Sequence, residues 1–340
     1  MPQFAAFFFD APRILCRLTF AMKLILATFI IVSIAPFADA QNPRYYSQQP
    51  IPGPKIFGEG IISAGDYESH AEFSVTGDTV YFVKSAPDLS KWTICVSYFK
   101  NNAWTAPEVA SFSGTYWDAD PFITKDGKEF YFISNRPLHE GEPAKDFDIW
   151  KMTRTSSGWS APVRLPDVIN SPESEYYPTL TDNGTLYFGS RRKGGKGAAD
   201  IYRSVLKNNV YQAAENLGDA INTEGSEFEP FISRDETYLI FMAARPDHLD
   251  YADLYVSYNK NGNWTVAQKL PEPFNSSVTE FSPKVSRDGR YFFFASTRNT
   301  NQSVKKETTA DMNKRLKGAG NGLGDIYQTD ISALKIQAGN

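Results

Sequence analysis

The feature that most constrains the fold is a stretch that recurs along the chain. The copy at residues 280–298 reads "EFSPKVSRDGRYFFFASTR", which has a leading acid, a proline, an Asp-Gly turn, an aromatic run and a final arginine. Similar copies lie at 227–245, 175–191 and 118–136, and a weaker one lies at 68–84. Their leading acids stand 50 to 57 residues apart. This spacing is typical of the blades of a β-propeller.

Each copy continues in the same way. After a variable loop, a third strand is predicted at "DIW" (148–150), "DIY" (200–202), "DLY" (253–255) and "DIY" (325–327). A fourth strand is predicted to open at an aromatic residue, namely Trp104, Trp159, Tyr211 and Trp264. Runs of β-forming residues on either side of Asp-Gly or Asn-Gly indicate hairpins. Each copy therefore predicts one four-stranded antiparallel blade, and the repeated aromatic indicates packing between blades.

The fifth copy ends before its fourth strand, and the N-terminal segment supplies the missing piece. "PKIFGEGIISAGDYE" (54–68) resembles "PVRLPDVINSPESE" (162–175), which ends one blade and begins the next. The sequence thus predicts an all-β, five-bladed propeller of four-stranded antiparallel blades, its ring closed by an N-terminal strand from residues 54–67. The blade repeats are expected near 68–117, 118–174, 175–226, 227–279 and 280–334.

Residues 22–40 have the features of a signal peptide: one lysine after Met22, an apolar run, and Ala38-Asp39-Ala40 before the cleavage point. Residues 1–21 are then an upstream extension, and residues 41–340 are a single propeller domain. The apolar run is too short for a good membrane span. We therefore expect a periplasmic or secreted protein with no membrane span once the signal is removed.

The repeats read acid-x-x-Pro, Asp-Gly, aromatic strand, Ser-x-Arg and Asp-Ile-Tyr, and in this they resemble the TolB-like family of propellers over almost the whole mature chain. The resemblance implies the architecture. It does not imply one function, because propellers of this type include protein-interaction modules and sugar-acting enzymes. The first copy departs from the pattern with Lys84 and Thr93 at the arginine and aspartate places, and the fourth has Glu236 at the turn glycine. The net charge of −4 gives no basic face for nucleic acid.

In a propeller, the start of the innermost strand and the loop between the second and third strands lie on one face, so the repeated charged residues are expected to share it. The acids are Glu68, Asp118, Glu175, Glu227 and Glu280, the bases are Lys84, Arg136, Arg191, Arg245 and Arg298, and the third-strand aspartates are Asp148, Asp200, Asp253 and Asp325. Because each type repeats, one interpretation is structural: the same acid, arginine and aspartate contact ties neighbouring blades together. The surplus of acids also favours a ligand that donates hydroxyl groups, or a cation.

The predicted binding residues are the five acids with Arg136, Arg191, Arg245 and Arg298, together with Trp117, which directly precedes Asp118. No cofactor is expected, although carboxylates around a channel would also suit Ca²⁺ or another divalent cation. The three histidines, His70, His139 and His248, fall on the same face and are the candidates for a metal site. Exposed loop residues are the alternative for His139 and His248, because blades two and four are not neighbours.

These observations favour an exported, non-catalytic propeller that binds an envelope or cell-surface protein, or a glycan, across its acidic channel face. The alternative is a glycan hydrolase that uses channel-mouth carboxylates, with Asp118 and Glu175 as the candidates. Hydrolysis needs two carboxyl groups in different environments, and equivalent repeat positions argue against that difference. The long loop at 299–324 contains a basic segment that predicts a short helix, either covering the mouth of the ring or exposed to solvent.

Overall fold

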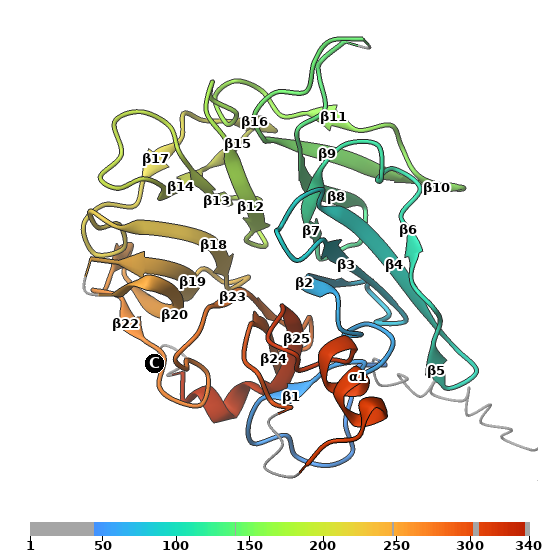
Figure 1. Ribbon diagram of the computed structural model, residues 1–340. Helices are drawn as coiled ribbons and strands as arrows, with labels where there is room; N and C mark the ends of the chain where they lie inside the picture. Colours follow the sequence, from blue (N-terminus) through green and yellow to red (C-terminus); the bar gives the residue numbers. More distant parts are fainter. Residues whose placement is uncertain (1–43, 140, 247, 302–305, 337–340) are drawn as a thin grey trace, which may run out of the picture. The chain divides into compact units, whose positions relative to one another are not determined.

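The protein was analysed as a computed structural model that describes residues 44–139, 141–246, 248–301 and 306–336. In the unit that begins at Pro43, five antiparallel sheets surround a common axis, and the chain runs from one sheet to the next around the ring (Figure 1). The predicted five-bladed propeller is confirmed. The predicted upstream extension and signal peptide lie outside the described residues. In the described part of the chain, no helix is long and apolar enough to cross a membrane.

The five blades have the same plan, with three long strands and an outer strand of short pieces, which in blade five is one piece only. Blade one contains β2 (Tyr67–Phe73), β3 (Thr79–Ser85), β4 (Thr93–Lys100), β5 (Ala103–Trp104) and β6 (Glu108–Val109). Blade two contains β7 (Asp118–Ile123), β8 (Glu129–Ser134), β9 (Asp148–Thr155), β10 (Gly158–Trp159) and β11 (Val163–Arg164). Blade three contains β12 (Glu175–Leu180), β13 (Leu186–Ser190), β14 (Asp200–Ser204), β15 (Leu206–Lys207), β16 (Val210–Tyr211) and β17 (Glu215–Asn216). Blade four contains β18 (Ser226–Ile232), β19 (Tyr238–Arg245), β20 (His248–Lys260), β21 (Asn263–Trp264) and β22 (Gln268–Lys269).

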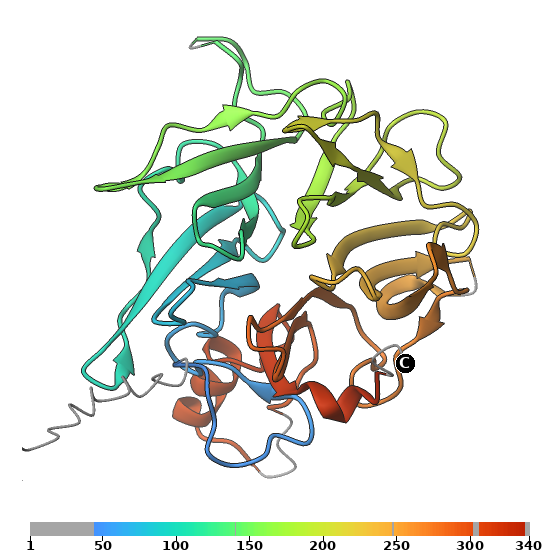
Figure 2. The ribbon, with the colours of Figure 1, turned by 180° about the vertical axis from the view of Figure 1, so that it is seen from behind.

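Blade five joins the two ends of the described chain. It contains β23 (Glu280–Val285), β24 (Tyr291–Ser296), β25 (Asp325–Asp330) and, as its outer strand, β1 (Lys55–Ile56). The view from behind shows the N-terminal strand beside the C-terminal ones (Figure 2). A short 3₁₀ helix (Ile331–Leu334) follows β25. The predicted closure by the N-terminal segment is confirmed.

A buried side chain after each outer strand clamps the third strand of the same blade. Asn170 illustrates the contact: its Oδ1 accepts from the N–H of Ile149 at 2.8 Å, and its Nδ2 donates to the carbonyl of Ile149 at 3.0 Å. Asn222 and Asn275 do the same in the next two blades. In blade five, Ser63 accepts from the N–H of the residue that follows Asp325. The sequence alignment that matched 54–68 with 162–175 therefore reflects a shared hydrogen-bond pattern.

The aromatic residues predicted to open the fourth strands pack against the preceding blade. Trp159 of blade two donates from Nε1 to the hydroxyl of Tyr81 in blade one at 3.1 Å. Tyr211 and Tyr131, of blades three and two, share a hydrogen bond of 3.3 Å between their hydroxyl groups. These contacts confirm packing between sheets, and they hold neighbouring blades together at the outside of the ring.

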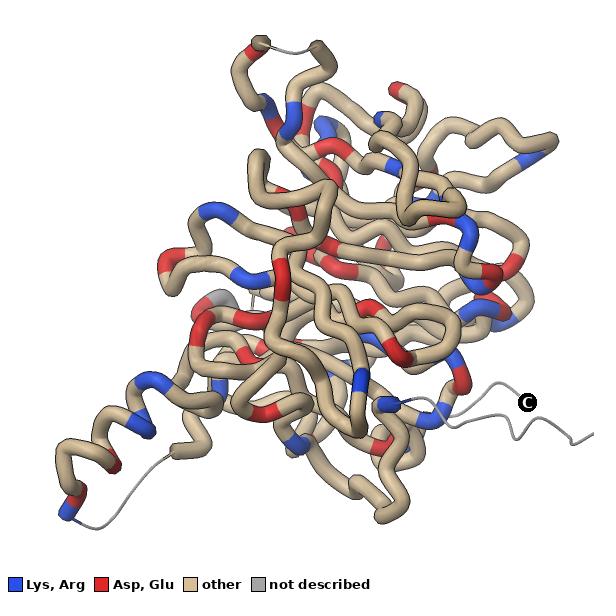
Figure 3. The backbone as a smooth tube through the Cα atoms, turned by 90° about the vertical axis from the view of Figure 1, so that its right-hand side faces the viewer, with Lys and Arg blue, Asp and Glu red and all other residues tan. Residues whose placement is uncertain are grey.

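The loop before β25 carries α1 (Thr309–Lys317), which is the helix predicted there. A capping box between Thr308 and Asp311 begins it, and none of its residues is buried. In a side view α1 extends away from the blades, while acidic and basic residues are interspersed over the rest of the backbone (Figure 3). The helix thus corresponds to the solvent-exposed alternative.

The closure of blade five leaves one buried acid without a side-chain partner on the outer strand. In blades two to four, the third-strand aspartate binds a side chain on the outer strand: the pairs are Asp148–Arg164, Asp200–Asn216 and Asp253–Lys269. In blade five, Ile56 stands at the equivalent place, opposite Tyr327. Asp325 is 0% exposed, and its Oδ1 has no hydrogen-bond partner within the described residues. Burial raises the pKa of Asp325 to about 6, and the hydrogen bond from the Gly320 N–H only partly opposes this shift.

Replacing Ile56 by lysine is expected to stabilise the ring, because the new ammonium group would supply the partner that Lys269 supplies in blade four. Since Asp325 is charged above about pH 6, the gain in the free energy of unfolding should be about 1 kcal/mol at pH 8 and should vanish near pH 4. Thermal melts of Ile56→Lys against Ile56→Met, which lacks the charge, measure it. Equal melting of the two variants at pH 8 would contradict the assignment.

Candidate functional site

The repeated acids are completely buried. They are Glu68, Asp118, Glu175, Glu227 and Glu280, each 0% exposed. Each accepts hydrogen bonds from the segment that leads into its blade. For Glu175, Oε2 accepts from the N–H of Ser171 at 2.8 Å, and Oε1 accepts from the hydroxyls of Ser171 and Ser190 at 2.7 Å. Burial raises the pKa of Glu175, and these hydrogen bonds oppose the rise.

The repeated bases bind these acids and also the connection from the preceding blade. Arg298 lies 3.0 Å from Glu280 and donates to the carbonyl of Phe274 at 3.2 Å. Arg136 lies 2.7 Å from Asp118 and donates to the carbonyl of Phe112 at 3.1 Å. The predicted tie between neighbouring blades is therefore present. The third-strand aspartates take no part in it, and that part of the prediction was wrong. In blades two to four they bind outer-strand side chains, and in blade five Asp325 accepts from the Gly320 N–H.

In blade three the base is Arg192, and the prediction of Arg191 at this place was wrong. Arg192 lies 3.2 Å from Glu175, and its Nε donates to the hydroxyl of Ser190 at 2.9 Å. The physical reason is the Ser-x-Arg spacing, because only the second residue after the serine turns back toward the acid, as Arg136 does after Ser134. Arg191 is exposed and lines the pocket described below.

The candidate catalytic pair, Asp118 and Glu175, belongs to this buried set. A general acid must reach the atom that it protonates. With 0% exposure, and with hydrogen bonds from the preceding connection as well as from their own blades, these two carboxyl groups are better suited to holding the blades than to contacting a glycan.

The candidate metal ligands are dispersed. His139 is exposed in the loop between β8 and β9. His248 begins β20, but its side chain lies outside the described part of the structure. Among the described residues, no group of three or more His, Cys, Asp or Glu side chains is arranged to hold a metal ion. His70 is in a different environment, which is set first by the conformation of its own backbone.

Directly after each repeated acid, the innermost strand is interrupted by a β-bulge. The pairing between the first and second strands shifts at this place in all five blades. The second residue after the acid has φ between 50° and 58°, and these residues are His70, Asp120, Tyr177, Glu229 and Ser282. Left-handed backbone costs a residue other than glycine about 1 kcal/mol or more. Because bulges re-aim side chains beside binding sites, five different side chains at a position that favours glycine indicate a role for the side chains themselves.

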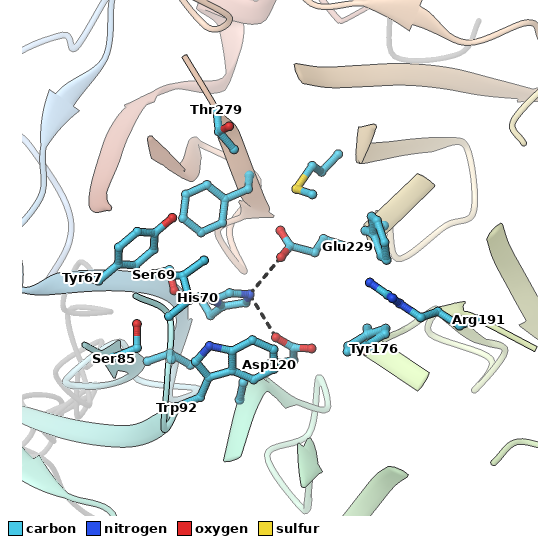
Figure 4. A pocket seen from close by; sticks show the side chains of 16 residues that line it. Tyr67, Ser69, His70, Ser85, Trp92, Asp120, Tyr176, Arg191, Glu229 and Thr279 are labelled. Carbon is cyan, nitrogen blue, oxygen red and sulfur yellow. Dashed lines mark hydrogen bonds and ion pairs between the residues drawn. The ribbon is translucent and has the colours of Figure 1, made fainter. Parts of the chain in front are cut away.

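The bulges surround one end of the central channel, where a pocket of about 350 Å³ opens (Figure 4). The first residue after each acid lines it: these are Ser69, Ala119, Tyr176, Phe228 and Phe281. Tyr67 and Trp92 add further rings to the wall. A volume of this size is at the lower end of small-molecule sites. The pocket lies on the face where the sequence predicts binding, but it is built from positions at which the blades differ.

At the centre of the pocket, one histidine bridges two carboxylates. His70 Nε2 lies 3.0 Å from Asp120 Oδ1 and 3.2 Å from Glu229 Oε1, as the dashed lines in Figure 4 show. His70 Nδ1 lies 2.5 Å from the hydroxyl of Ser69. Burial alone would lower the pKa of His70, but the two carboxylates outweigh it and raise this pKa to about 9. The imidazole is therefore charged at neutral pH, and the three groups together carry one negative charge.

Both carboxylates are also bound by the backbone of the next blade. Asp120 Oδ2 accepts from the N–H of Tyr177 at 2.8 Å, and Glu229 Oε2 accepts from the N–H of Ser282. The charged cluster of His70, Asp120 and Glu229 therefore connects all five blades around the channel. We call these three residues the channel triad.

Beyond the triad, charged and polar side chains line the channel, and a second pocket of about 300 Å³ opens among them. The hydroxyl of Tyr177 donates across the channel to the carbonyl of Pro283 at 2.7 Å. Beyond it, the buried ammonium of Lys284 lies 2.7 Å from Glu72, and Arg287 donates to the carbonyl of Ile123 at 2.9 Å. The pocket at the triad shares no lining residue with this second one.

Trp117, a predicted binding residue, lies next to the pocket wall. Its ring centroid is 6.0 Å from that of Trp92, which lines the pocket and stacks on Phe147 at 4.9 Å. Sequence reasoning named His70 only as a metal ligand and did not name Asp120, Glu229 or Trp92. The sequence signal that could have found them is the difference between copies. The otherwise similar copies differ at the two residues that follow each repeated acid.

No family model matches the chain, and no curated protein matches it. Solved structures do match. An endo-arabinase from Bacteroides thetaiotaomicron is 14% identical and similar over 86% of this chain and 100% of that one, with a TM-score of 0.51. A protein described as TolB from Agrobacterium tumefaciens is 14% identical over 78% of this chain and 91% of its own, with a TM-score of 0.46. An α-L-arabinofuranosidase from Lactobacillus brevis is 12% identical over 78% of this chain and 91% of its own, with a TM-score of 0.44. At these identities the likeness shows the propeller fold alone.

Proposed function

We propose that this chain is a non-catalytic binding protein that holds the end of a glycan in the channel pocket. The composition of the pocket carries the proposal. The rings of Tyr67, Trp92 and Tyr176 stand around a polar centre that contains Asp120 and Glu229. Sugars present apolar C–H faces, which pack on aromatic rings, and hydroxyl groups, which donate to carboxylates. A few polar groups within an apolar wall are the usual means of orienting a small ligand.

The shape of the pocket favours the end of a chain over the two alternatives of a glycan bound along its length and a protein partner. A stable protein interface buries roughly 800 Å² on each side, whereas this site is a recess of about 350 Å³. Behind it, Tyr177 donates across the channel to the carbonyl of Pro283, and the Lys284–Glu72 ion pair lies beyond. The sugar residues beyond the first one or two would therefore extend into solvent.

The channel triad argues against hydrolysis. In a glycosidase, the sugar that reacts lies between the two carboxyl groups, which differ in protonation. Here the imidazole of His70 occupies the space between Asp120 and Glu229, within 3.2 Å of both. Each carboxylate also has the same kind of second partner, a backbone N–H. The geometry thus supports binding and orientation, because Asp120 and Glu229 are held in the same way.

Export belongs to the same proposal. It rests on the signal-like sequence of residues 22–40 and on the resemblance of the repeats to TolB-like propellers, and it would place the pocket where glycans are met.

The proposal is tested by glycan binding to residues 41–340, followed by tryptophan fluorescence, because Trp92 lines the pocket. We expect a saturable change with at least one member of a panel of envelope, plant and algal oligosaccharides, and no release of new reducing ends over hours. Tyr176→Ala should weaken that binding by about fivefold, through loss of ring contact worth roughly 1 kcal/mol. Val266→Ala is the matched surface control, since Val266 is 73% exposed on the outer edge of blade four.

Two results would reject the proposal. One is the absence of saturable binding by any member of the panel, measured by fluorescence and by calorimetry. The other is binding that Tyr176→Ala leaves unchanged, which would place the ligand elsewhere on the protein. Production of reducing ends by the wild type would support the hydrolase alternative.

A further inference from the structure

One cation at the pocket has no partner that neutralises it. Arg191 is exposed and lines the pocket, where Figure 4 shows it beside Tyr176 and directed toward the triad. Its guanidinium carbon lies 5.8 Å from the ring centroid of Tyr176 and 5.6 Å from that of Phe228. Within the described residues, its side chain makes no ion pair and no hydrogen bond. The two carboxylates nearest the pocket centre are already bound to His70.

The rings hold Arg191 in place without using its donors. A guanidinium group over aromatic faces keeps its N–H groups free at the edge of its plane. Because the side chain is already held, less conformational entropy is lost when those donors bind a ligand. The free edge of a guanidinium matches the two oxygens of a carboxylate, and such bidentate pairs are among the strongest hydrogen-bonded contacts.

The pocket therefore offers two complementary regions: an acceptor region at the triad and a donor region at Arg191. We propose that the glycan end bound here is an acidic sugar, a uronic acid, whose carboxylate pairs with Arg191 while its hydroxyl groups donate to Asp120 and Glu229. This inference rests on the proposed function and narrows it to one substrate class. A neutral sugar would leave the guanidinium unpaired as the ligand excludes water, which costs affinity.

The test compares uronate polysaccharides with chemically matched neutral ones. Polygalacturonate, alginate and hyaluronan are immobilised alongside the same three polymers after reduction of their carboxyl groups to primary alcohols. Binding of residues 41–340 is measured for the wild type, Arg191→Gln and Lys193→Gln. Lys193 is the control, because its side chain is 93% exposed, lies outside the pocket and carries the same charge.

We expect at least one uronate polymer to bind, with affinity reduced tenfold or more by carboxyl reduction and by Arg191→Gln, and unchanged by Lys193→Gln. Binding that survives reduction, or that is weakened equally by both substitutions, overturns the inference and leaves glycan binding intact. Failure of every acidic and neutral glycan to bind overturns the proposed function as well. The melting temperature of each variant shows whether a loss of binding reflects unfolding.

Discussion

Replacing His70 by alanine is expected to lower the free energy of unfolding by about 3 to 5 kcal/mol at pH 7, the range found when one member of a buried ion pair is removed. His70 is the shared cation of Asp120 and Glu229, and the side chains of the three are only 11%, 5% and 15% exposed. Its loss leaves two carboxylates in the channel without a counter-charge. Urea denaturation of wild type and variant measures the difference.

The cause of the lower stability of His70→Ala can be tested by also removing the charges of Asp120 and Glu229. Adding Asp120→Asn and Glu229→Gln to His70→Ala should recover part of the lost stability, because each amide oxygen still accepts the backbone N–H that the carboxylate accepted. His139→Ala is the control, since His139 is exposed in a loop and should change stability by less than about 0.5 kcal/mol. A triple variant no more stable than His70→Ala would contradict the electrostatic explanation.

The dependence of stability on pH gives the triad a second signature. The pKa of His70 is raised from 6.5 to about 9 in the folded protein. The stabilisation is therefore fully present below about pH 6.5 and is lost as the pH rises through about 9, by roughly 3 kcal/mol in total. The stability difference between wild type and His70→Ala should decrease over this interval. A difference that is constant from pH 6 to pH 10 would show that the imidazole is not held as a cation.

The propeller was predictable because its determinants are local and repeated. The Asp-Gly and Asn-Gly turns, the buried second strands and the blade-closing Asn or Ser recur at a fixed place in each copy, so one copy checks the others. The match of residues 54–68 with residues 162–175 placed the N-terminal strand correctly, because both segments carry the side chain that binds the third strand. Repetition identifies the contacts that every blade needs.

The site was not predictable by the same reasoning, because it occupies the places that do not repeat. The acid that is repeated at the start of each blade forms the buried ion pairs. His70, Asp120 and Glu229, in contrast, differ in type and come into contact only when the ring closes. The left-handed backbone at these positions is also hard to infer, since glycine, its usual signal, is absent from all of them. In this ring of similar blades, the variable residues beside the repeated acids are the ones that line the pocket.

Substituting the two adjacent arginines of blade three distinguishes a repeated position, which holds the blade, from a non-repeated position, which lines the pocket. Arg192→Met is expected to lower the free energy of unfolding by about 3 kcal/mol, because Glu175 is 0% exposed and would lose its charged partner, and the carbonyl of Ile169 would lose a donor. Arg191→Met should cost less than about 1 kcal/mol, since its side chain only stacks on Tyr176 and Phe228 at the surface. Urea titrations of the two single variants give both values.

The binding of an acidic glycan should respond in the opposite order. Arg191→Met removes the donor that faces the pocket and leaves the blade intact, whereas Arg192→Met leaves every group that lines the pocket in place. At a temperature where both variants remain folded, Arg191→Met should bind the glycan more weakly than the wild type. Arg192→Met should keep the affinity of the wild type and have only a lower free energy of unfolding. Equal effects of the two substitutions on stability would contradict the assignment of Arg192 to the repeated ion pair and restore Arg191 as a candidate for it. The result thus decides whether the Ser-x-Arg spacing specifies which arginine holds the blade and which one meets the ligand.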